Sequence, residues 1–140
     1  MFKISNVAAI ALVAGSMFGS GVANAEEELI GSNEYRVSCA SCHGIGGKGD
    51  GNMAQFLTVK PTDLTMLAKS TGDGVYPFLK VFQTIDGRSQ VSGHGDRAMP
   101  VWGDRYKLED VKKYGSFGGE AATRARVLEL VYYLQSIQQK

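Results

Sequence analysis

Residues 39–43 read CASCH: two cysteines lie three positions apart, and a histidine follows the second directly. Side chains three positions apart on a helical turn share a face. The thiols of Cys39 and Cys42 can therefore both reach the vinyl groups along one edge of a porphyrin and add to them as thioethers, and His43 can offer its imidazole to the iron. The motif is the attachment signature of c-type haem, so we expect one covalently bound haem at this point of the chain.

Other chemistries also use two cysteines at this spacing. A redox-active C-x-x-C follows a strand, and no strand pattern precedes Cys39. A zinc site needs four well-placed ligands, which His94 would have to complete, and the adjacent Cys42 and His43 would strain to share one tetrahedron. A disulfide between the two cysteines is the simplest alternative in an exported chain. Haem attachment is the interpretation we favour among these.

The first 25 residues have the pattern of a secretory signal peptide. Lys3 gives a small positive start, residues 7–18 form an apolar run too short to span a bilayer comfortably, and ANA at 23–25 fits a cleavage site. We expect cleavage after residue 25, export to the periplasm, and a single domain over residues 26–140. An uncleaved membrane anchor is the alternative. Export agrees with haem attachment, because covalent attachment of this kind takes place outside the cytoplasm.

Composition narrows the possible partners. The chain has 15 basic and 14 acidic side chains, and loss of Lys3 with the leader leaves 14 of each. Such a near-neutral chain argues against nucleic acid as a partner. Neither a G-x-S-x-G motif nor a P-loop is present, so the sequence points to no other chemistry.

Helical patterns alternate with glycine-rich loops, and no run of alternating apolar and polar residues predicts a strand. We expect an all-α fold of four or five helices. Asp63 or Thr62 should cap one helix, and Gly87 should stand just beyond another. The expected helices cover 29–41, 62–69, 76–85 and 108–114, and a last helix carries Val127, Leu130, Val131, Leu134 and Ile137 at spacings of three and four.

Over most of residues 29–138 the chain resembles the class I, mono-haem c-type cytochromes of bacteria. Beyond CASCHG, the resemblance rests on Gly31 and Tyr35 ahead of the motif, and on the stretches GKGDG, KPTDLT, AMPVWG and LVYYLQSI. It implies a cytochrome c-like fold around one covalent haem, in which the N- and C-terminal helices cross. Gly31 would then permit a close approach, with Tyr133 packed nearby. Segments 89–98 and 104–119 are longer than in the simplest family pattern.

A haem iron held by His43 leaves its other axial position open or filled by a second ligand. Met99 lies in a loop far along the chain, its thioether suits ferrous iron, and Pro100 restrains its backbone. We therefore expect Met99 to be the second ligand, and the family's axial-methionine loop implies the same residue. His94 stands between two glycines and is expected to be a solvated loop residue. Met66 is expected to fill core space.

Four further residues are candidates for the surroundings of the haem. The family's proline in this loop implies that the carbonyl of Pro61 accepts a hydrogen bond from the second ring nitrogen of His43; a simple turn proline is the alternative. Trp102 could line the pocket and donate to a haem propionate. Arg88 and Arg97 are possible propionate partners, although most loop arginines are only solvated.

These features predict a periplasmic one-electron carrier, not an enzyme, with unidentified redox proteins as donor and acceptor. One alternative is the cytochrome subunit of a periplasmic or membrane-bound oxidoreductase, with segment 104–119 serving the contact. A haem protein with an open site for ligand binding or sensing is a less favoured alternative.

Overall fold

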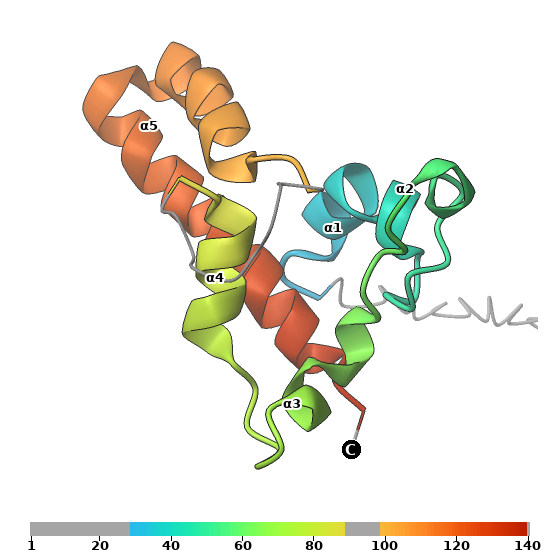
Figure 1. The fold of residues 1–140 in the computed structure, drawn as a ribbon. Helices are drawn as coiled ribbons and strands as arrows, with labels where there is room; N and C mark the ends of the chain where they lie inside the picture. The colour runs from blue at the N-terminus through green and yellow to red at the C-terminus, as the bar shows by residue number, and fades with distance from the viewer. Residues whose placement is uncertain (1–28, 89–98, 140) are drawn as a thin grey trace, which may run out of the picture.

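The computed structural model of the chain describes residues 29–88 and 99–139. Within these ranges the fold is helical and contains no strand, which confirms the predicted all-α class. The predicted signal peptide, His94 and Arg97 lie outside the described residues. In chain order the elements are α1 (Ser32–Ser38), α2 (Ala40–His43), the 3-10 helices η1 (Ala54–Phe56) and η2 (Leu64–Met66), α3 (Leu67–Ser70), α4 (Phe78–Asp86) and α5 (Trp102–Ser136), as Figure 1 shows.

Two helix boundaries follow the predicted local signals. The Asp63 carboxylate accepts a hydrogen bond of 2.9 Å from the backbone N–H of Thr65, and so caps η2 as expected. Pro77 stands at the start of α4, and Gly87 ends it with a left-handed φ of 64°. The first helix was predicted as one piece over 29–41, but Cys39 (φ −117°) separates α1 from α2.

The long element α5 is a helical hairpin. Its backbone leaves helical geometry at Gly115 (φ 75°, ψ 174°), where the sequence predicted a stop. The first arm begins at Trp102, six residues before the predicted start at 108. The arms approach closely at Gly119, where an added Cβ would lie 2.6 Å from the Cα of Val111. Farther from the bend, the buried Thr123 hydroxyl donates a hydrogen bond of 3.1 Å to the Asp110 carboxylate.

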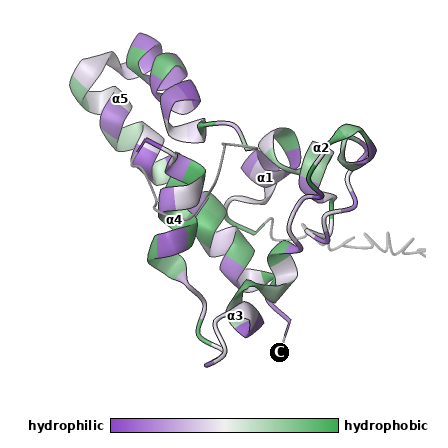
Figure 2. Cartoon of the chain, viewed as in Figure 1, coloured by the Kyte–Doolittle hydropathy of each residue, from purple (hydrophilic) through white to green (hydrophobic). Residues whose placement is uncertain are grey.

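The second arm of α5 is the centre of the core. Its apolar residues Val127, Leu130, Val131 and Leu134 are buried, as their spacing predicted. Figure 2 shows hydrophobic residues on this arm where it passes α4. The start of α1 lies against the same arm, since a Cβ on Gly31 would be 2.1 Å from the carbonyl oxygen of Glu129.

A charged cluster joins α1 to both arms of the hairpin. The Arg126 guanidinium lies 3.2 Å from Glu34, 3.0 Å from Glu109 and 3.4 Å from Asp110. It also stacks 3.8 Å from the centre of the Tyr106 ring. The Asp110 side chain is only 8% exposed, so it depends on Arg126 and Thr123 for its partners.

Replacing Arg126 with methionine is expected to destabilise the fold by about 2 kcal/mol, because it leaves the Asp110 carboxylate without a cation in a buried position. Methionine keeps an apolar stem over Tyr106, so the loss reports charge and hydrogen bonding. Chemical denaturation measures the effect. The matched control is Arg124→Met, whose exposed i,i+4 pair with Glu120 should contribute only about 0.3–0.5 kcal/mol. Equal losses in the two variants would contradict the role of the cluster.

Candidate functional site

The CASCH residues form one tight helical turn. The backbone N–H of Cys42 donates to the carbonyl of Cys39 at 3.1 Å, and that of His43 donates to the same carbonyl at 2.9 Å. The two thiols and the imidazole therefore come from a single turn, as their spacing predicted. Both cysteines are free, with Cys39 buried and Cys42 partly exposed, so the structure contains no disulfide between them.

The imidazole of His43 is oriented by a backbone carbonyl. Its Nδ1 lies 3.1 Å from the carbonyl oxygen of Thr62. A carbonyl can only accept a hydrogen bond, so Nδ1 carries the proton and Nε2 keeps a free lone pair. Burial lowers the pKa of His43, which also favours the neutral ring. The expected acceptor, the carbonyl of Pro61, is wrong by one residue; whether Pro61 lines a haem pocket stays a prediction.

The loop after His43 folds back onto this turn. The N–H of Gly49 donates to the carbonyl of His43 at 2.8 Å, and the N–H of Met53 donates to that of Ser41 at 2.9 Å. These bonds satisfy carbonyls at the end of α2 and place the glycine-rich loop beside the motif. The loop was predicted from composition, but the short helix η1 within it was not.

Large apolar side chains in this loop are poorly covered. Ile45 is 81% exposed and Phe56 is 72% exposed. Met53, Leu57 and Val59 are exposed as well. A loop folded onto the motif with so many open apolar side chains fits a large apolar group bound beside it.

Tyr35 joins α1, the motif and α5. Its buried hydroxyl donates a 2.6 Å hydrogen bond to the carbonyl of Gly44, directly after His43. Burial raises the pKa of Tyr35, so the hydroxyl keeps the proton that it donates. The ring lies 4.8 Å from that of Tyr133, between centroids. The sequence singled out both tyrosines, and the expected close approach of Gly31 to the C-terminal helix, with Tyr133 packed nearby, is confirmed.

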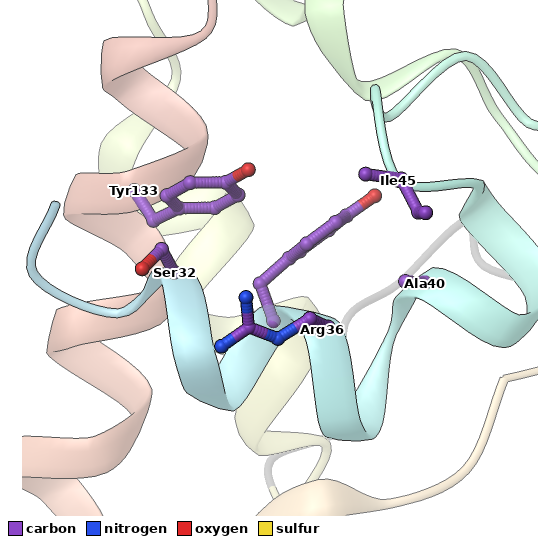
Figure 3. Close-up of a pocket in the computed structure, with 6 residues that line it drawn as sticks. Ser32, Arg36, Ala40, Ile45 and Tyr133 are labelled. Atoms are coloured by element: carbon purple, nitrogen blue, oxygen red, sulfur yellow. The ribbon is translucent and has the colours of Figure 1, made fainter. Parts of the chain in front are cut away.

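A small cavity of about 80 Å³ opens between these elements, as Figure 3 shows. Tyr133 reaches from α5 toward the turn that carries Ala40 and Ile45. The cavity is far too small for a porphyrin. Its lining residues are Ser32, Tyr35, Arg36, Ala40, Ile45 and Tyr133.

The structure brings part of the predicted site together in the core. Cys39 and Trp102 belong to one buried cluster, and the partly buried Met99 packs against that cluster. The cluster and the residues packed against it thus include Cys39 and Met99, which are 60 positions apart in the sequence. Trp102 stacks at 5.6 Å from Tyr106.

Arg88 has partners of its own. Its guanidinium lies 2.6 Å from Asp86 and 2.9 Å from Glu120. The hydrogen bonds that Arg88 donates to the Asp86 carboxylate raise the pKa of Arg88 further above its ordinary value. The structure thus gives Arg88 a role in fastening α4 to α5, and its expected contact with a propionate stays a prediction.

Comparison with protein-family models, with curated proteins and with solved structures found no match to this chain. Within residues 29–88 and 99–139, no three His, Cys, Asp or Glu side chains are arranged to hold a metal ion among themselves. In the same ranges, no helix combines the length and the apolar character needed to cross a bilayer. The chemistry of the motif and of its surroundings is therefore what points to a function.

Proposed function

We propose that the chain is a mono-haem c-type cytochrome that carries single electrons between redox proteins in the periplasm, with a cytochrome c-like fold. The observation that carries the proposal is the one-turn arrangement of Cys39, Cys42 and His43, with both thiols free and the imidazole held in one tautomer. When bound, the haem supplies an iron that alternates between the ferrous and ferric states.

The residues present fit such a group. Cys39 and Cys42 offer two free thiols for thioether bonds, and each S–H would add across one vinyl C=C of the porphyrin. His43 offers Nε2, while the carbonyl of Thr62 keeps Nδ1 protonated and makes the ring a better ligand. The exposed apolar side chains Ile45 and Phe56 supply a surface that a porphyrin would cover.

Met99 would be the second protein ligand of the haem iron in this proposal. It is partly buried and packs against the core cluster to which Cys39 and Trp102 belong, which supports an apolar environment for its thioether. A thioether in such surroundings favours ferrous iron and raises the reduction potential.

Visible and near-infrared spectra of the purified protein test the proposal. They should show one c-type haem per chain and the charge-transfer band of His/Met ligation. A chain recovered from a host with working haem maturation but without covalent haem would refute it.

The Met99→Ala variant is expected to lose that near-infrared band, to lower its potential and to bind CO rapidly when reduced, since one axial position is then open. Met66→Ala is the matched control, because Met66 is partly buried in η2 and should leave the spectrum unchanged. Rapid CO binding by the unaltered protein would favour the open-site alternative instead.

A further inference from the structure

The apex of the α5 hairpin is an exposed aromatic and basic projection. Phe117 is 95% exposed and Tyr114 is 52% exposed, on either side of the bend at Gly115. Lys112 and Lys113 are exposed directly before Tyr114. A Cβ added at Gly115 would meet nothing within 4 Å, so nothing covers the bend on that side. Figure 1 places this bend at the upper left, on the opposite side of the molecule from α2.

Contacts between the two arms of the hairpin fix the position of its apex. The contact of Gly119 with Val111 and the hydrogen bond of Thr123 to Asp110 join the two arms. The contacts between the two arms therefore hold Phe117 in an exposed position. Phe117 is not buried in the core, although it is among the largest apolar side chains of the chain.

The acidic side chains of the hairpin nearest to the apex are already engaged in ion pairs, which leaves the apex positive. Glu120 pairs with Arg88, Lys107 and Arg124, and the hydrogen bonds from Arg88 and Arg124 lower the pKa of Glu120 to about 2. Glu109 and Asp110 pair with Arg126. The segment 111–118 contains two lysines and no acidic residue.

We propose that this apex, residues 112–117, docks on an anionic lipid bilayer. Phe117 enters the boundary between headgroups and acyl chains, Tyr114 lies at headgroup level with its hydroxyl in water, and the lysines meet the lipid phosphates. The positive charge of the apex complements the negative charge of the lipid surface.

A lipid surface suits the shape of the apex better than a protein does. A stable protein interface buries about 800 Å² on each partner and seats its aromatic anchors in formed pockets. A six-residue projection with one almost fully exposed ring offers too little area for that. A fluid bilayer closes around a single ring without a preformed pocket. The proposal does not depend on haem, and it would hold an electron carrier beside membrane-bound partners.

Vesicle co-sedimentation of the full chain, in the form recovered after export, tests the proposal. Two vesicle types are compared, phosphatidylcholine alone and phosphatidylcholine mixed with phosphatidylglycerol, each in low and high salt. The unaltered protein should prefer the anionic vesicles, and high salt should remove the preference. Any contribution of the apolar N-terminal run is common to all variants and to both vesicle types.

Two variants locate the contact. Phe117→Ser and the double variant Lys112→Gln, Lys113→Gln should each lower partition onto anionic vesicles by about tenfold or more. The matched control, Leu79→Ser with Lys80→Gln, alters an equally adjacent exposed apolar and basic pair on α4 and should bind as the unaltered protein does. Unchanged circular dichroism shows that each variant is folded.

Equal binding to the two vesicle types, or apex variants that bind like the control, would overturn the proposal. Soluble polyglutamate is added as a competitor in a parallel arm. If polyglutamate binds the apex while anionic vesicles do not, the surface belongs to an acidic protein and the lipid assignment is wrong.

Discussion

Replacing both Cys39 and Cys42 with serine is expected to yield a chain without bound haem that has lost most of its helical structure. The thioether bonds are the covalent links in the proposed site, and serine hydroxyls do not add to vinyl groups under the same conditions. Ile45 and Phe56 are exposed on the loop that follows His43, so the proposed haem would be the main apolar cover of these side chains. A chain of this size with loops so rich in glycine has little core to spare.

Far-ultraviolet circular dichroism and the haem spectrum of the same sample measure this effect. The matched control is Ser41→Ala, an exposed change inside the motif that keeps both thiols and should retain haem and helix. Native helicity in the serine double variant, with no haem bound, would show that the fold forms without the cofactor. Such a result would contradict a structural role of the proposed haem and would leave the proposed electron transfer unaffected.

Local signals in the sequence predicted three of the element boundaries correctly. Asp63 caps η2 and Gly87 ends α4 because capping depends on a few neighbouring atoms and on glycine's access to positive φ. The bend at Gly115 was found for the same reason. The early start of α5 at Trp102 was not predicted. The first arm has weak apolar periodicity, and packing against the second arm stabilises its helical structure.

Contacts between distant segments set the limit of prediction at the site. The spacing of Cys39, Cys42 and His43 is a local property, and the turn that it predicted is present. The acceptor for the ring nitrogen of His43 lies 19 residues away, where a shift of one residue decides between Pro61 and Thr62. The ion pair of Arg126 with Glu34 spans 92 residues, and no local pattern marks it.

Replacing Gly31 with alanine is expected to destabilise the fold by about 3–4 kcal/mol, a substantial part of the stability of a small domain. Two causes add at this residue. Gly31 has a φ of +80°, which costs a residue with a Cβ about 1–2 kcal/mol. The added Cβ would also lie 2.1 Å from the carbonyl oxygen of Glu129, an atom of the α5 backbone that cannot rotate away.

Gly74→Ala separates the two causes. Gly74 has nearly the same φ, +76°, but an added Cβ would meet nothing within 4 Å. The stability lost in the Gly74→Ala variant should therefore stay near the backbone cost of about 1–2 kcal/mol. Chemical denaturation of the two variants measures the difference, which isolates the close approach of α1 to α5. If both variants lose the same stability, the two helices move apart at no cost, and the contact that brings Tyr35 to Tyr133 does not depend on a glycine at position 31.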